Sequence, residues 1–165
     1  MVVYTPGSEN MNDCGKTSVL FGVFGLSPKG LMLAVEKARQ GYRTECFDYR
    51  PFKIDMLNRG ISFCDGVSES ELGELVHSGR LAAYNDMSRL RNLDYIALPV
   101  PHNSDLECYN IKNIAKEIAL RMHRGVAIVF ENMRHLNEME NEITPILETS
   151  GLRRGKDFFF GFLNK

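Results

Sequence analysis

The sequence predicts an α/β fold, a doubly wound parallel sheet of about six strands in a single domain. Short apolar runs, of the kind found in strands buried on both faces, alternate along the chain with helical patterns. Residues 19–48 have the pattern of a strand, a glycine-bounded turn, a helix and a second strand that ends in an acid. That is the layout of a dinucleotide-binding βαβ unit. Right-handed crossovers then place helices on both faces, and the expected strand order is 3-2-1-4-5-6.

The βαβ unit begins with an apolar strand over 19–24 and passes through a turn into a helix. Gly41 stands just past the end of the helix, where a left-handed cap is favoured. The second strand covers 44–47, and Asp48 closes it about 20 residues beyond the glycines. The helix itself is indicated by apolar residues spaced for one face, namely Leu31, Ala34, Val35 and Ala38.

The rest of the chain continues the alternation of strands and helices. Pro51 opens a short helix that Gly60 stops. Ser68 and Glu71 form a capping box for another helix, which ends near Ser78. Strands are predicted over 82–84, 95–98, 126–130 and 158–162, and helices over 111–122 and 138–150.

The turn after the first strand is a variant of the dinucleotide-binding G-x-G-x-x-G motif, Gly25–Leu26–Ser27–Pro28–Lys29–Gly30. Gly25 would make the tight turn, and Gly30 would let helix and strand pack closely. The middle glycine normally lets the backbone approach a pyrophosphate, and Ser27 stands in its place. The serine side chain either intrudes on the phosphates or hydrogen-bonds one of them. The alternative is a βαβ unit that binds no nucleotide, because glycines also serve turns and close packing.

Polar residues follow the carboxyl ends of the strands, where ligands bind in such a sheet. The basic residues among them, together with the dipole of the first helix, indicate an anion site for a pyrophosphate. The alternative is that they are simply polar loop residues. Asp48 could accept hydrogen bonds from an adenosine ribose diol and would favour NAD over NADP, a preference that Arg50 weakens. Alternatively, Asp48 is a turn or cap residue. The residues at these strand ends are Ser27, Lys29, Asp48, Arg50, His102, Asn132, Arg134 and His135.

Length and composition fit one compact domain, expected over 18–165 after a loose, polar extension at 1–17. A net charge of −1 and a pI near 6.4 provide no drive toward nucleic acid or an anionic membrane. No apolar run has the length of a membrane span. The four cysteines are scattered without a C-x-x-C pair, and the four histidines lack metal-ligand spacing. We therefore expect a cytoplasmic protein with reduced thiols and no metal site.

Several segments at matching spacing resemble the UDP-glucose/GDP-mannose (nucleotide-sugar) 6-dehydrogenases. The likeness extends over about residues 19–163 and implies the NAD-binding, Rossmann-like domain of that family. It is carried by Val23–Leu26, Gly30–Ala34, Gly41–Arg43, Phe47–Asp48, Lys53, Met56–Ser62, Ser78–Leu81, Pro99–Pro101, Pro145–Glu148, Ser150–Leu152 and Gly155–Phe159.

The resemblance implies which residues surround NAD. The implied cofactor site comprises Gly25, Leu26, Ser27, Lys29, Gly30, Asp48, Arg50, Lys53, Pro99, Val100, Pro101 and Glu131. This chain departs from the family at Ser27, which replaces a glycine, and at Val100, which replaces a threonine. Asn132 and Met133 replace a Ser-Thr pair, and 134–137 replaces a Val-Pro-Pro-Gly-like turn.

The family's nucleophilic cysteine, catalytic lysine and sugar-binding half have no counterpart in the sequence, so we assign no catalytic residue. The first functional hypothesis is an NAD-binding dehydrogenase domain that is inactive alone in oxidising the sugar C6 alcohol to an acid. The second is a non-catalytic nucleotide-binding sensor or scaffold, a pseudoenzyme. A methyltransferase-like domain that binds an adenosyl cofactor is a third. Phe158–Phe162 lies in the last strand and is expected to leave apolar surface for a homodimer or a partner chain.

Overall fold

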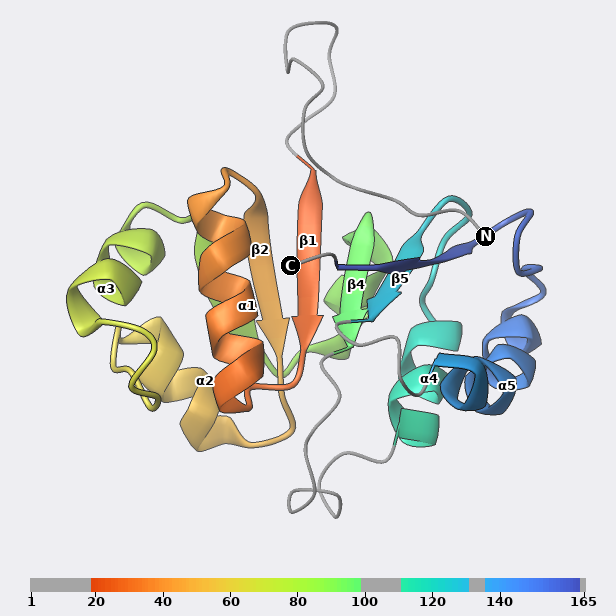
Figure 1. Ribbon diagram of the computed structural model, residues 1–165, viewed down its shortest axis with the longest axis horizontal. Coiled ribbons are helices and arrows are strands. Elements are labelled where there is room, and N and C mark those ends of the chain that lie inside the picture. The colour runs from red at the N-terminus through yellow and green to blue at the C-terminus, as the bar shows by residue number, and fades with distance from the viewer. Residues whose placement is uncertain (1–18, 99–110, 131–135, 164–165) are drawn as a thin grey trace, which may run out of the picture.

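The computed structural model describes residues 19–98, 111–130 and 136–163. Its centre is a six-stranded, fully parallel sheet in the order β3-β2-β1-β4-β5-β6 (Figure 1). The predicted fold class and strand order are therefore both confirmed. The strands are β1 (Leu20–Phe24), β2 (Arg43–Phe47), β3 (Leu81–Tyr84), β4 (Tyr95–Leu98), β5 (Ala127–Phe130) and β6 (Phe159–Phe162).

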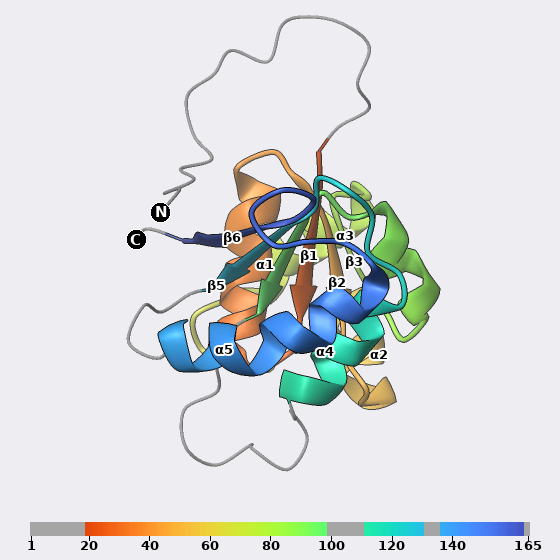
Figure 2. The same ribbon diagram turned by 90° about the vertical axis from the view of Figure 1, so that its right-hand side faces the viewer.

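Helices cover both faces of the sheet, as right-handed crossovers require. The helices α1, α2 and α3 lie on one face of the sheet, and α4 and α5 lie on the opposite face (Figures 1 and 2). The helices are α1 (Pro28–Arg39), α2 (Pro51–Asn58), α3 (Glu69–His77), α4 (Ile111–Ala119) and α5 (Leu136–Leu147), with 3-10 helices η1 (Met87–Asn92) and η3 (Glu148–Ser150).

Two apolar cores, one on each face, hold these layers together. The first joins α1, α2 and α3 to the sheet through residues such as Leu31, Leu57 and Leu72, all fully buried. The second joins α4, α5 and η1 to the other face through residues that include Ile118 and Ile143. Successive residues of β2, Cys46 and Phe47, point into different cores, as the two-residue period of a strand requires.

The predicted elements match the observed ones to within one or two residues at most ends. The N-cap half of the predicted capping box is present, because the Ser68 hydroxyl accepts a hydrogen bond from the Glu71 N–H, whereas the Glu71 carboxylate pairs with Arg39 of α1. Gly41 adopts a φ of 97° just past α1, as its sequence position predicts. Phe158 precedes β6 instead of belonging to it, and the sequence reading missed η1.

A buried ion pair fixes η1 against the sheet. The Glu45 carboxylate belongs to β2 and is 3% exposed, and it accepts hydrogen bonds from the Arg89 guanidinium of η1. That guanidinium also lies over the ring of Tyr84, 3.9 Å from its centroid. The hydrogen bond to Glu45 is the main cause of a raised pKa at Arg89. A buried carboxylate requires such a partner, because desolvation of an unpaired charge is costly.

The edge strand β3 is covered by a side chain of α2. The Asn58 amide donates to the Ala83 carbonyl oxygen at 2.9 Å and accepts from the Ala83 N–H at 2.8 Å. Asn58 thus satisfies both backbone groups of Ala83, in the manner of a neighbouring strand.

Removing Arg89 should strongly destabilise the fold. In Arg89→Met, Glu45 would remain buried without its cation, and we expect a loss of about 3 kcal/mol in the free energy of unfolding, measured by urea denaturation. Arg91→Met, which removes an exposed arginine of the same 3-10 helix, should change it by less than about 0.5 kcal/mol. Equal effects of the two substitutions would contradict a special role for the Glu45 pair.

Candidate functional site

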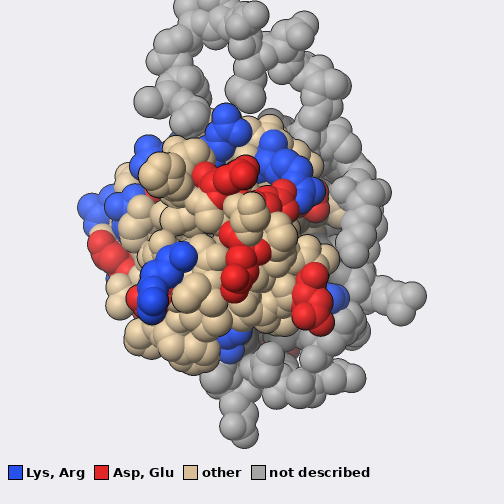
Figure 3. Space-filling view, turned by 90° about the vertical axis from the view of Figure 1, so that its left-hand side faces the viewer, with Lys and Arg blue, Asp and Glu red and all other residues tan. Residues whose placement is uncertain are grey.

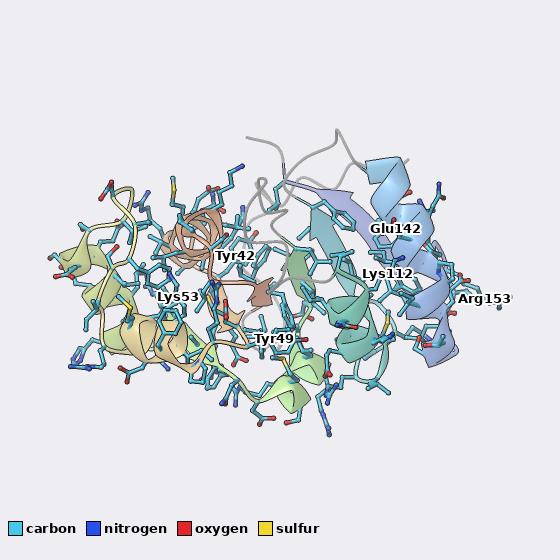
Figure 4. The ribbon with its side chains drawn as sticks, turned by 90° about the horizontal axis from the view of Figure 1, so that it is seen from below. Tyr42, Tyr49, Lys53, Lys112, Glu142 and Arg153 are labelled. Carbon is cyan, nitrogen blue, oxygen red and sulfur yellow. The ribbon has the colours of Figure 1, made fainter. Side chains whose placement is uncertain are left out.

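The candidate site lies at the carboxyl ends of the parallel strands, which we call the carboxyl edge, where loops connect β1 to α1 and β2 to α2 (Figure 4). Gly25 leaves β1 with a φ of 113°, a conformation that residues with a side chain rarely adopt. Its N–H donates to the Phe47 carbonyl oxygen at 2.7 Å. The first glycine of the motif therefore makes the tight turn predicted for it.

Ser27 caps the N-terminus of α1, a role that the sequence reading did not consider. Its hydroxyl accepts a hydrogen bond from the Gly30 N–H at 3.1 Å, and Pro28 is the first residue of the helix. The backbone of Ser27 is extended, with a φ of −70° and a ψ of 166°, as expected for a residue before proline. A serine followed by proline at the first helical position is a known start signal, and it could have indicated this cap.

Gly30 brings α1 into contact with the turn. A Cβ atom at this position would lie 1.9 Å from the Gly25 carbonyl oxygen, so no larger residue fits without moving backbone. This is the close helix–strand approach that the third glycine of the motif provides.

The Asp48 side chain joins the two loops that follow β1 and β2. It is 1% exposed, and one carboxylate oxygen accepts from the Leu26 N–H at 2.7 Å. The other accepts from the Arg50 N–H at 2.8 Å. The Arg50 guanidinium binds both oxygens, through Nε and Nη2, at 3.0 Å each. Asp48 and Arg50 thus form a two-pronged ion pair at the end of β2.

Aromatic and basic side chains lie in the segments next to this pair. Lys53, one turn into α2, has its Nζ 3.7 Å from the centroid of the Phe63 ring, a cation–π contact. Tyr49 lies near the middle of the edge, between the α2 side and the α4 side (Figure 4). It is 46% exposed and packs edge-on against Phe24, with ring centroids 5.6 Å apart. Its pKa is raised, mainly by partial burial and then by Glu117 of α4.

Cys46 in β2 is fully buried directly behind this site. Burial is the main cause that raises the pKa of its thiol, and the carboxylates of Asp48 and Glu45 raise it further. The thiol therefore stays protonated near neutral pH and acts as a small apolar residue of the core.

Six of the predicted site residues are joined by the contacts described above: Gly25, Leu26, Ser27, Gly30, Asp48 and Arg50. Lys29 and Lys53 lie in the first turns of α1 and α2. Four others, Pro99, Val100, Pro101 and Glu131, lie outside the described residues, as do His102, Asn132, Arg134 and His135. Tyr49 and Phe63 join the site and were not predicted, because their positions depend on how the loops fold back. Their aromatic character beside Asp48 and after Gly60 was the only available signal.

In the described part of the chain, no group of three or more histidine, cysteine or acidic side chains could hold a metal ion. Within the same residues, no helix is both long enough and apolar enough to cross a membrane.

Comparison with solved structures shows the same fold in nucleotide-sugar dehydrogenases. An NDP-N-acetyl-D-galactosaminuronic acid dehydrogenase from Methanosarcina mazei Go1 matches 90% of this chain with a TM-score of 0.75 and 24% identity. A GDP-mannose dehydrogenase from Pseudomonas aeruginosa matches 86% with a TM-score of 0.71 and 22% identity. A UDP-D-ManNAc dehydrogenase from Pyrococcus horikoshii matches 89%, with the same TM-score and identity.

The match covers only 35–37% of the length of these enzymes, so the chain corresponds to about a third of each. No protein-family model matches the sequence, and no curated protein matches it. The resemblance to nucleotide-sugar dehydrogenases that the sequence indicates is therefore confirmed at the level of the fold.

Gly30 and Gly73 offer a matched test of the close packing between α1 and the turn after β1. Gly30→Ala should cost at least 2 kcal/mol in the free energy of unfolding, because its Cβ would overlap the backbone of Gly25. Gly73→Ala, inside α3 where a Cβ meets nothing within 4 Å, should instead gain about 0.5–1 kcal/mol. Thermal and urea denaturation would measure both, and a harmless Gly30→Ala would contradict the packing role.

Proposed function

We propose that this chain is a nicotinamide-dinucleotide-binding domain of the nucleotide-sugar dehydrogenase type and that it binds NAD. The observation that carries this proposal is the turn from β1 to α1. Gly25 bends the chain with a positive φ, and Gly30 brings the helix N-terminus against the end of β1. A helix N-terminus next to a glycine turn is suited to a pyrophosphate, because its N–H groups and dipole favour negative charge.

The residues at this edge fit a dinucleotide in part. Gly25 has the positive φ and Gly30 the close helix–strand approach that the motif requires, and Asp48 follows β2, where the motif has its ribose-binding acid. The middle glycine is replaced by Ser27, whose hydroxyl takes up the Gly30 N–H. Pro28 contributes no N–H of its own. Both changes remove donors from the phosphate position, so we expect weak binding, about tens of micromolar or poorer.

In a complete enzyme, this chain would bind and orient NAD, and the bound NAD would accept the hydride. The solved enzymes that share the fold are about three times longer than the match. We propose that a separate part, in the same or another chain, would supply the sugar site. The matched segment alone would then hold the dinucleotide without oxidising a nucleotide sugar. The described cysteines, Cys46 and Cys64, are free thiols, which supports a reducing compartment such as the cytoplasm.

A non-catalytic sensor or scaffold is the second candidate. The self-contained hydrogen bonding of Ser27 and Asp48 favours it, because both side chains already have partners at the place where a ligand would bind. A methyltransferase-like domain is the third candidate, and the similarity to dehydrogenase folds argues against it. Nucleic acid is a poor partner for the face that α3 covers, because acidic side chains occupy its middle (Figure 3).

Titration of the purified chain with NAD tests the cofactor proposal. Ser27→Gly should tighten NAD several-fold by releasing the Gly30 N–H, and it should cost the helix only a few tenths of a kcal/mol. Asp48→Ala should weaken NAD, because the Leu26 turn loses its anchor. Asp55→Ala, an exposed acid of α2, is the matched control and should leave binding unchanged.

Calorimetry with NAD, S-adenosylmethionine and UDP-sugars would separate the candidates. If NAD binds neither the wild type nor Ser27→Gly, the sensor or scaffold hypothesis is favoured. Weaker NAD binding by Ser27→Gly would mean that the hydroxyl itself is a phosphate ligand. Steady NADH production from UDP-glucose or GDP-mannose by the chain alone would contradict its proposed inactivity.

We also propose that the β6 edge contacts a second copy or a partner chain. Phe159 of β6 is 39% exposed, and β6 is an edge strand of the described sheet. Exposed apolar side chains on an edge strand are typical of interfaces, although each alone is common on protein surfaces.

Light scattering at increasing concentration would test this interface. Wild-type protein should form dimers, and Phe159→Asp should shift it toward monomer by placing a charge in the contact. Phe52→Asp, at a 58% exposed phenylalanine of α2, should leave the dimer intact. A wild type that stays monomeric at high concentration, and that captures no partner in pull-downs, would refute the proposal.

A further inference from the structure

The ion pair between Asp48 and Arg50 bears on which dinucleotide the proposed site accepts. A carboxylate has about four acceptor positions on its two oxygens. Among the described residues, four donors occupy them: the N–H groups of Leu26 and Arg50, and two N–H groups of the Arg50 guanidinium. The acid is also almost completely buried. The acceptor positions that a ribose diol would need on Asp48 are therefore already occupied.

An NAD-selective acid works in two ways, and the pair weakens both. It accepts hydrogen bonds from the ribose hydroxyls, and its negative charge repels a 2′-phosphate. At Asp48, the diol would have to displace bonds from Arg50 in which both partners are charged, whereas in the bonds that replace them only the carboxylate is charged. The adjacent guanidinium, 3.0 Å from both oxygens, also compensates the charge of the acid.

The group that the pair presents toward solvent is cationic. The Arg50 side chain is 22% exposed, whereas that of Asp48 is 1% exposed. Lys53 follows one helical turn later, so a second positive charge lies on the same helix. A guanidinium carries a fork of five N–H donors, of which the bonds to Asp48 use two, and an arginine near the ribose position accommodates the 2′-phosphate of NADP.

We propose that Arg50 is the specificity-determining residue of this site and that, by covering Asp48, it makes the site bind NADP at least as tightly as NAD. This inference rests on the proposed dinucleotide function and adds the choice between the two cofactors. The Asp48 position alone predicts a preference for NAD. The side chain two residues later reverses that prediction.

The test compares ligands that differ only at the ribose. The affinities of NAD and NADP report on the whole site, whereas those of AMP and adenosine 2′,5′-bisphosphate report on the adenosine ribose position without the nicotinamide half. Titration calorimetry at fixed low salt should give a dissociation constant for NADP equal to or below that for NAD. The bisphosphate should bind at least tenfold more tightly than AMP.

Variants on each side of the pair should move the NADP/NAD preference in opposite directions. Arg50→Gln should lower it at least tenfold, and Arg50→Lys should lower it less, because lysine keeps the charge without the fork. Asp48→Asn should raise it, since an amide still accepts from the Leu26 N–H but carries no charge. Arg59→Gln removes an exposed arginine at the other end of α2 and should leave the ratio unchanged.

Arg50→Gln leaves a buried carboxylate, so its thermal unfolding is measured alongside, and Arg50→Lys carries the test if it fails to fold. A wild type that prefers NAD by tenfold or more would overturn this inference and leave the dinucleotide function intact. Binding of the bisphosphate without either dinucleotide would support the phosphate-accepting ribose position and contradict the dinucleotide function. Binding of none of the four ligands would overturn both.

Discussion

One buried carboxylate connects the two loops on which the carboxyl edge of this protein depends. Asp48 holds the Leu26 N–H on one side and Arg50 on the other, so the turn into α1 and the turn into α2 have a common anchor. Hydrogen bonds to a charged group each contribute about 1.5–3 kcal/mol, more than the bonds between neutral groups around them. The close approach of Gly30 to Gly25 adds a steric constraint at the same place. Together they make this corner the best-defined part of the site.

The same corner shows how structural and binding roles compete for a few polar atoms. An N–H at the start of α1 can donate to a phosphate or to a capping side chain, and Ser27 takes one such N–H. A carboxylate at the end of β2 can bind a ribose or a neighbouring cation, and Arg50 is that cation. Both of these internal bonds stabilise the unliganded protein. A ligand that uses the same N–H group or the same carboxylate must break the internal bond or bind beside it. The affinity and selectivity of the site therefore depend on the chain's own hydrogen bonds.

The fold could be predicted from sequence because it is encoded in local, periodic signals. Apolar strands such as 95–98 and the apolar face of α4 differ clearly in period, and parallel sheets with short crossovers permit few topologies. The site residues around Gly25 and Asp48 were predicted for the same reason, since the motif is continuous with the strand–helix unit.

Several interactions of the fold and of the site could not be predicted in this way. The pairing of Glu45 with Arg89 joins residues that are far apart in the sequence, and no period or motif marks it. The short helix η1 carries no apolar stripe long enough to be recognised. For Asp48, the sequence identified the residue but left its role open between ligand and turn, because that depends on where the Arg50 side chain turns.

Asn58 has a consequence for how copies of this protein could associate through their sheets. By bonding both backbone groups of Ala83, it occupies the β3 edge, so strand addition there would have to displace an existing pair of hydrogen bonds. In the described sheet the opposite edge is β6. Pairing of two copies through their β6 edges alone would close on itself and would not extend into an unlimited ribbon. A single amide side chain thus biases misassembly toward closed pairs and away from fibrils.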